Sequence, residues 1–136
     1  MTHLSGYSDA ATGGDAEGQA WYSVSQKNGY VVVSAAGEID LATSPALHEA
    51  VSVAAKCSPR IAIDLTQATL LDATGLSALV GGLHRVRGQD GEVALVGTTG
   101  VVRSAVEGTG LHHVFAMHDH LEDGVAALMK SSTREP

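Results

Sequence analysis

Residues 60–65, Arg60-Ile61-Ala62-Ile63-Asp64-Leu65, form a short run that is apolar on both faces when the chain is extended. Such a run is typical of a central strand that helices cover on at least one side. Patterns of helical spacing flank it in the sequence, one before it and one after it. The run therefore predicts a parallel strand inside an α/β sheet.

The helix before this strand is predicted to begin at Ser44, the expected N-cap, because Pro45 suits the first helical position. Its buried stripe has members at i, i+3, i+4 and i+7, namely Leu47, Ala50, Val51 and Ala54. After the strand, residues 66–74 are expected to form a loop. A second helix is then predicted over residues 75–87, with Gly88 as its stop signal.

Gly81 and Gly82 lie inside the second predicted helix, where each costs about 1 kcal/mol relative to Ala. Glycines in such positions indicate either a close packing approach or a tolerated defect. The sequence leaves both interpretations open.

Strand and helix patterns also occur toward both ends of the chain. Residues 21–25 and 30–36 alternate or are rich in β-branched residues, and Asn28-Gly29 between them favours a hairpin turn. Later segments are predicted as a strand (92–96), a short helix (101–106, ending at Gly108), a strand (114–117) and a helix (about 120–130) capped by Asp119. The predicted fold class is α/β, in the order β-β-α-β-α-β-α-β-α, with parallel central strands and an N-terminal hairpin at the edge.

The 136-residue chain is long enough for one domain. Residues 1–19 are rich in Gly, Ala, Ser, Thr and Asp and predict a disordered leader; residues 20–129 are expected to fold, and residues 130–136 to form a polar tail. The first twenty residues lack the basic start and apolar run of a signal or membrane anchor. With the single Cys57, this pattern indicates a cytoplasmic protein without membrane insertion.

Charge excludes some classes of partner. Eight basic residues against fifteen acidic ones give a formal net charge of −7, which opposes binding to a phosphate backbone. Aromatic residues are only 4% of the chain, too few for a base-stacking surface. We therefore expect no direct contact with nucleic acid.

The segment from Leu70 to Leu76 places an acid, Asp72, two residues before a hydroxyl, Thr74, at the start of a predicted helix. By residue type Thr74 is a good N-cap, with Gly75 at the first helical position. The unpaired backbone N–H groups of a helix start also favour an anion on that hydroxyl. Spacing alone does not decide between a structural cap and a phosphate acceptor.

Three segments together resemble the STAS domain of bacterial anti-sigma factor antagonists. They are Gly37-Glu38-Ile39-Asp40-Leu41, residues 61–65, and residues 71–79, which contain Asp72-Ala73-Thr74-Gly75. The stretch from Val96 to Leu111, with its Gly110-Leu111 turn, is similar as well. The resemblance covers residues 22–129, which is nearly the whole predicted folded unit.

The resemblance implies a role for each residue of this segment. In the family the pattern is Asp-Ser-(Ser or Thr)-Gly, and its second hydroxyl is phosphorylated by the partner, an anti-sigma factor that is an ATP-dependent serine/threonine kinase. Thr74 occupies that position, Asp72 matches the motif acid, and Asp40 matches an acid beside the phosphorylation site. Ala73 departs from the pattern, since Ser is usual there. The implied partner-binding residues are Asp40, Asp72, Ala73, Thr74 and Gly75.

The implied mechanism is partner switching. The unphosphorylated protein binds the anti-sigma factor, which then frees its sigma factor, and phosphorylation of Thr74 reverses the binding by adding about −1.5 to −2 charges. Catalysis is assigned to the partner, because this chain has no Gly-x-x-x-x-Gly-Lys phosphate loop. We expect a non-enzyme that needs no cofactor.

Other interpretations remain open. A STAS-like domain can instead serve as a scaffold or accessory subunit of a signalling or lipid-transport assembly. Asp64 at the end of a strand suggests a phosphoacceptor of the receiver type, but the acidic pair and the late Lys of that site are not evident. His118 and His120 would share a face of a strand and could bind a metal, but the cap expected at Asp119 breaks that geometry. We expect no metal site.

Overall fold

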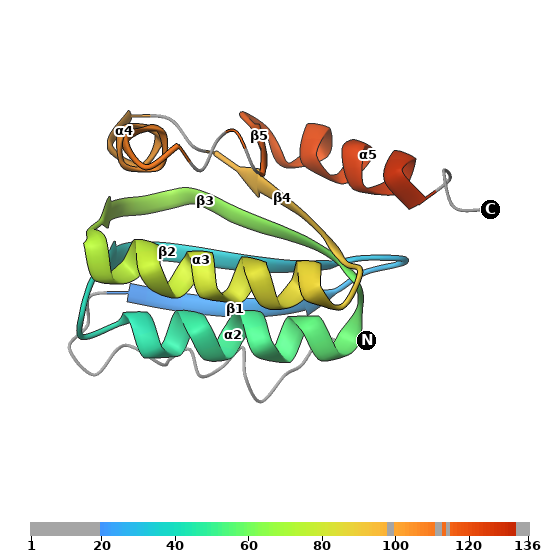
Figure 1. Cartoon of the computed structure of the whole chain (residues 1–136), viewed down its shortest axis with the longest axis horizontal. Helices are drawn as coiled ribbons and strands as arrows, with labels where there is room; N and C mark the ends of the chain where they lie inside the picture. Colours follow the sequence, from blue (N-terminus) through green and yellow to red (C-terminus); the bar gives the residue numbers. More distant parts are fainter. Residues whose placement is uncertain (1–19, 98–99, 111–112, 114, 133–136) are drawn as a thin grey trace.

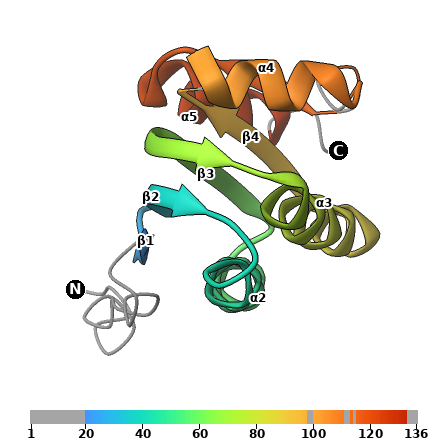
Figure 2. The same ribbon diagram turned by 90° about the vertical axis from the view of Figure 1, so that its left-hand side faces the viewer.

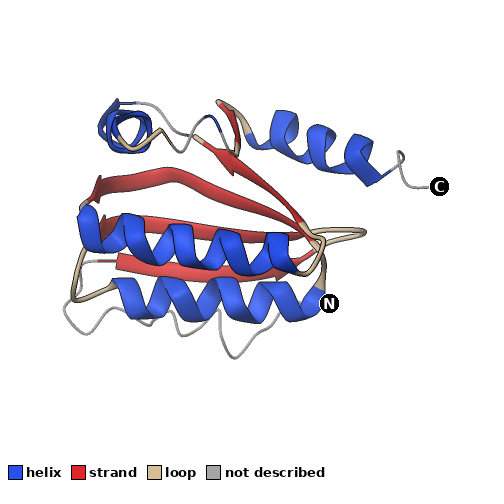
Figure 3. Ribbon diagram, viewed as in Figure 1, coloured by secondary structure: helices blue, strands red, loops and turns tan. Residues whose placement is uncertain are grey.

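The computed structural model describes residues 20–97, 100–110, 113 and 115–132. Within them, helices alternate with strands after an initial hairpin, which confirms the predicted order (Figures 1 and 3). The elements are β1 (Ala20–Gln26), β2 (Val31–Ile39), α2 (Ser44–Cys57), β3 (Arg60–Leu71), α3 (Ala73–Gly88), β4 (Glu92–Val96), α4 (Gly100–Gly108), β5 (Ala116–His118) and α5 (Leu121–Ser132). The predicted leader, residues 1–19, lies outside the described residues.

The strands form one five-stranded sheet in the order β1-β2-β3-β4-β5. β1 pairs antiparallel with β2, and the turn between them closes through a hydrogen bond from Lys27 N to Tyr30 O of 2.8 Å. Gly29 adopts φ +100 there, a conformation that glycine tolerates well. The pairs β2–β3, β3–β4 and β4–β5 are all parallel, which confirms the predicted hairpin and the parallel centre of the sheet.

Helices α2 and α3 lie side by side on one face of the sheet (Figure 2). Their apolar stripes join the inward side chains of the strands in the main core, which includes the fully buried Leu47, Ile63 and Leu83. α5 packs against β3 and β4, and its Leu128 forms a second buried cluster with Val32, Ala62 and Ala94. Ile63 and Ala62 are both buried, so the central strand is apolar on both faces, as predicted.

The two adjacent glycines of α3 have different roles. A Cβ atom on Gly82 would lie 2.8 Å from Val51 Cγ1 on α2, so this glycine permits the close approach of the two helices. A Cβ atom on Gly81 would meet nothing within 4 Å. The packing interpretation is therefore right for Gly82, and Gly81 is the tolerated defect.

Two predicted boundaries around α2 and β3 are wrong. The N-cap of α2 is Thr43, whose carbonyl oxygen accepts a hydrogen bond of 3.1 Å from Ala46 N, so Ser44 is already inside the helix. The loop predicted at residues 66–74 is mostly strand, since β3 continues to Leu71. It continues because β2 runs alongside it to the pair Ile39–Leu71, which supplies hydrogen-bonding partners that the local sequence does not reveal.

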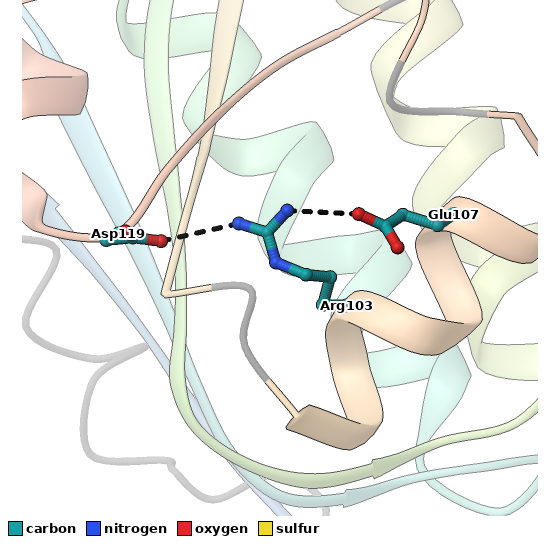
Figure 4. A network of polar contacts seen from close by, with 3 residues as sticks. All are labelled: Arg103, Glu107 and Asp119. Atoms are coloured by element: carbon teal, nitrogen blue, oxygen red, sulfur yellow. Dashed lines mark hydrogen bonds and ion pairs between the residues drawn. The ribbon is translucent and has the colours of Figure 1, made fainter.

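The C-terminal boundaries shift as well. β5 spans Ala116–His118 instead of 114–117, and residue 114 lies outside the described residues. Phe115 lies just before β5 and is buried against α3, with the centroid of its ring 5.2 Å from the Arg87 guanidinium carbon. The predicted cap at Asp119 is wrong, since the last helix begins at Leu121. The Asp119 carboxylate instead forms an ion pair of 3.3 Å with Arg103, and Arg103 forms a second one of 3.1 Å with Glu107 (Figure 4).

Within the described residues, no helix is both long enough and apolar enough to cross a membrane.

Candidate functional site

The predicted site residues gather where β2 and β3 reach their carboxyl ends. Asp40 follows β2 directly, and Asp72 follows β3 and precedes α3. A hydrogen bond of 3.1 Å from Asp72 N to Ile39 O joins the two segments. The structure thus places Asp40 at the same edge of the sheet as residues 72–75.

Asp72, and not Thr74, caps α3. Asp72 is extended (φ −91, ψ −176), and its Oδ1 accepts a hydrogen bond of 2.9 Å from Gly75 N. Its carbonyl oxygen accepts the first helical bond, from Leu76 N at 2.8 Å. Ala73 is therefore the first helical residue and Thr74 the second, so the expected cap at Thr74, with Gly75 as first helical residue, is wrong. Asp72 therefore supplies the side-chain cap that Thr74 was expected to supply.

The Thr74 hydroxyl neither caps α3 nor forms a hydrogen bond within the part of the chain that the structure describes. Thr74 is half-buried, its neighbour Ala73 is exposed, and no hydrogen bond joins the Thr74 side chain to any described residue. Because Asp72 performs the capping, the hydroxyl can be modified without loss of a cap. The usual structural explanation for a Thr at this position does not apply.

Gly75 fixes the first turn of α3 against the end of β2. A Cβ atom at this position would lie 2.5 Å from Ile39 O and 2.8 Å from Ile39 Cγ2, closer than real Cβ atoms approach. Ile39 is fully buried, so it has little room to move away. Because Gly75 has no Cβ atom, the segment with Asp72 and Thr74 can lie close to the segment with Asp40.

Asp40 organises the loop between β2 and α2. Its Oδ1 accepts hydrogen bonds from Ala42 N (3.1 Å) and Thr43 N (3.2 Å). In return, Thr43 Oγ1 accepts from Asp40 N (3.0 Å) and donates to Glu38 O (2.8 Å). The loop is held by reciprocal bonds, so Asp40 has a structural role besides its charge. This role of Thr43 was not predicted; the spacing Asp-x-x-Thr before Pro45 is the signal that could have indicated it.

Tyr22 lies beneath this loop and is 3% exposed. Burial raises the pKa of its phenol; the nearby Thr43 hydroxyl opposes this shift and the Asp40 carboxylate adds to it. The hydrogen bonds of Thr43 itself go to the backbone and carboxyl of its loop, and Tyr22 Oη has no hydrogen-bond partner among the described residues. Tyr22 is a further residue that sequence analysis missed, since it gives no local signal.

Charge is distributed unevenly along the sheet. No Lys, Arg or His occurs in residues 31–47 or 61–83, which include the whole site. Basic residues lie instead near the other ends of these elements: Lys56 in the last turn of α2, Arg60 at the start of β3, and Arg85 and Arg87 in the last turn of α3. The edge that carries Asp40 and Asp72 is therefore acidic without a nearby basic side chain from those segments.

The two alternative sites are not assembled among the residues that the structure describes. Asp64 lies inside β3 instead of at its end, and its Oδ1 accepts hydrogen bonds from Thr66 N (3.0 Å) and Thr66 Oγ1 (2.6 Å). In the described part of the chain, no group of three or more His, Cys, Asp or Glu side chains could hold a metal ion. His118 is in β5 and His120 lies beyond its end, so the two do not share one strand.

Comparisons with known proteins show what this chain is similar to. The family model of the STAS domain matches residues 22–124. The anti-sigma-F factor antagonist RsfB of Mycobacterium tuberculosis is 31% identical over 107 residues, which are 78% of this chain and 87% of RsfB. A crystal structure of an anti-sigma factor antagonist from Mycobacterium paratuberculosis matches with a TM-score of 0.75 at 31% identity, over 81% of this chain and 94% of that one.

A more distant structural match shows the fold alone. The anti-sigma factor antagonist SpoIIAA has been solved in an unphosphorylated form (TM-score 0.69, 17% identity, 80% of this chain and 96% of that one). It has also been solved in a phosphorylated form, with a TM-score of 0.63. The predicted fold class is confirmed by these structures. The family model and the mycobacterial relatives lead to one conclusion: this chain belongs to the STAS domain family of anti-sigma factor antagonists.

Proposed function

We propose that this protein is an anti-sigma factor antagonist whose binding to an anti-sigma factor is switched off by phosphorylation of Thr74. The observation that supports the site assignment is that Asp72, and not Thr74, caps α3. Asp72 caps the helix, so the half-buried Thr74 hydroxyl has no hydrogen bond to a described residue. SpoIIAA, a relative of the same fold, exists in phosphorylated and unphosphorylated forms.

The proposed partner is an anti-sigma factor that is also a serine/threonine kinase. In the transfer, Thr74 Oγ1 bonds to the γ-phosphorus of ATP, the bond from that phosphorus to the bridging oxygen breaks, and ADP leaves. The hydroxyl proton passes to a base of the partner. This chain supplies the acceptor and its orientation, and the partner supplies the nucleotide site and the catalytic groups.

The charge change is large enough to act as a switch. A phosphate adds about −1.5 to −2 charges to a surface that already carries Asp40 and Asp72. A penalty of about 2.7 kcal/mol weakens binding about a hundredfold, which is within the range for a charge at a partly buried contact. The N-terminus of α3 favours an anion, so it offsets part of the repulsion within the free protein.

The test is phosphorylation by the cognate anti-sigma factor with ATP, followed by mass spectrometry of the intact protein and its peptides. We expect one phosphate, on Thr74, in the wild type and in Thr74→Ser, and none in Thr74→Ala. Thr69→Ala is the matched control, since Thr69 is an exposed Thr in β3, the strand that precedes α3, and it should be labelled like the wild type.

Binding of the same variants completes the test. Thr74→Ala should bind the anti-sigma factor like the wild type, and Thr74→Glu should bind more weakly. Labelling of Thr74→Ala at the wild-type level would refute the site assignment. Failure of the unphosphorylated wild type to bind any anti-sigma factor would favour a scaffold or accessory role instead.

A further inference from the structure

Exposed apolar side chains are concentrated near the proposed site. Among the residues that the structure describes, three large apolar side chains are exposed: Trp21 (58%), Leu41 (71%) and Leu70 (38%). Leu41 directly follows Asp40, and Leu70 comes two residues before Asp72. Two of the three therefore flank the acidic residues of the site.

The two leucines are held at the same edge of the sheet. Leu70 is the register partner of Glu38, and the next pair is Ile39 with Leu71. Ile39 and Leu71 are buried (0% and 5%), so the edge is well packed and the exposure of the neighbouring leucines does not reflect a loose end.

Leu41 is presented by an ordered loop. The Asp40 carboxylate binds the N–H groups of Ala42 and Thr43, and the Thr43 hydroxyl binds back to Glu38 O. Leu41 sits between these anchored residues and loses little further backbone freedom when a partner covers it. Leu41 is therefore a solvent-exposed apolar side chain on an ordered backbone, which is preorganised for contact with a partner.

The surroundings of the leucines define the chemistry of what covers them. Glu38, Asp40 and Asp72 lie in the same two segments, and those segments carry no Lys, Arg or His. The edge thus presents apolar side chains bordered by carboxylates. It complements a partner surface with an apolar depression bordered by Lys or Arg side chains. A second copy of this chain would set acid against acid, so self-association through this edge is disfavoured.

We infer that Leu41 and Leu70 are the apolar anchors through which this edge docks onto the anti-sigma factor, in a depression of the partner that basic side chains border. The inference rests on the proposed function for the identity of the partner. It goes further in assigning most of the affinity to two side chains outside the phosphorylated motif. A phosphate on Thr74 would then bring its charge to the border of an apolar contact, where water cannot screen it fully.

The experiment measures binding of the full, unphosphorylated chain to the purified anti-sigma factor that labels Thr74, by calorimetry. We expect Leu41→Ser and Leu70→Ser each to weaken binding about tenfold, and the double variant about a hundredfold. The Leu41→Met/Leu70→Met variant keeps apolar side chains of similar volume and should bind within about threefold of the wild type. Binding of the double Ser variant should also show a smaller negative heat-capacity change.

Folding and function are separated by two controls. The unfolding midpoint of each variant is measured, and a loss of affinity counts only where the midpoint stays within a few degrees of the wild type, as expected for exposed positions. Thr74→Glu is measured in parallel. If it binds weakly while the double Ser variant binds like the wild type, the inference is overturned and the proposed function stands. If the wild type itself does not bind, both are overturned.

Discussion

Substituting each interior glycine of α3 by alanine tests how tightly the site is built. Gly75→Ala places a Cβ atom 2.5 Å from Ile39 O, a backbone atom that cannot rotate away. Either α3 shifts or the hydrogen bond from Asp72 N to Ile39 O lengthens. Overpacking of this kind costs about 1–3 kcal/mol and a strained hydrogen bond about 1 kcal/mol, whereas alanine in a helix returns up to about 1 kcal/mol. We expect a net destabilisation of about 1–3 kcal/mol.

The other two glycines provide matched controls in the same helix. Gly81→Ala meets nothing within 4 Å, so only the gain in helix propensity remains and we expect a stabilisation of up to about 1 kcal/mol. Gly82→Ala places its Cβ atom 2.8 Å from Val51 Cγ1, a less severe contact than the 2.5 Å between a Cβ atom at position 75 and Ile39 O, so its effect should fall between the other two. The order of stability is therefore predicted as Gly81→Ala, wild type, Gly82→Ala, Gly75→Ala.

Urea unfolding followed by circular dichroism measures the free energies, and thermal unfolding checks them at about 4 °C per kcal/mol for a domain of this size. The three variants share one chemistry, so their differences report the surroundings of each Cβ atom. A Gly75→Ala variant as stable as Gly81→Ala would refute the close contact between α3 and β2.

Three further predictions concern single side chains. Asp72→Ala should lower the free energy of unfolding by about 1 kcal/mol through loss of the cap, and Asp72→Asn by much less, as urea unfolding can show. Burial raises the pKa of Tyr22, so above about pH 10 the folded protein keeps a phenol proton that the unfolded chain loses. The free energy of unfolding should therefore be independent of Tyr22 below about pH 10 and should decrease above it. Tyr22→Phe should remove this decrease. Arg103→Met should cost at most about 1 kcal/mol, and less in high salt, because both ion pairs of Arg103 are exposed.

The element order could be predicted because most elements carry their own periodicity. The helical stripe of Leu47, Ala50, Val51 and Ala54 is fully buried in α2, as its spacing indicates. The run at residues 60–65 is apolar on both faces and lies in the centre of the sheet. In these elements the local pattern and the tertiary environment select the same structure.

The second half of β3 could not be predicted from its own residues. Thr66, Gln67 and Thr69 are exposed and give no alternating apolar signal. This stretch is a strand because β2 extends beside it, with two register shifts, as far as the Ile39–Leu71 pair. Pairing with a distant segment decides the conformation there, and a single sequence does not display such pairings.

The choice of cap at α3 also depends on tertiary contacts. Asp72 and Thr74 are both good N-cap residues by type, and their local sequence permits either. The hydrogen bond from Asp72 N to Ile39 O and the close approach of Gly75 to the same oxygen fix the chain so that helical geometry begins directly after Asp72. The sequence identified the segment in which α3 begins and assigned the cap to the wrong residue of that segment.

This reassignment determines how a modification of Thr74 would act. If Thr74 were the cap, a phosphate on its oxygen would alter the first turn of α3, and the signal would be a change of shape. Because Asp72 caps the helix, the proposed phosphate leaves those bonds in place and changes the local charge. A charge effect at a partly exposed edge is screened by salt, with a Debye length of about 8 Å at physiological ionic strength and about 3 Å at 1 M. The difference in affinity between wild type and Thr74→Glu should therefore shrink as salt rises, whereas a change of shape would keep it constant.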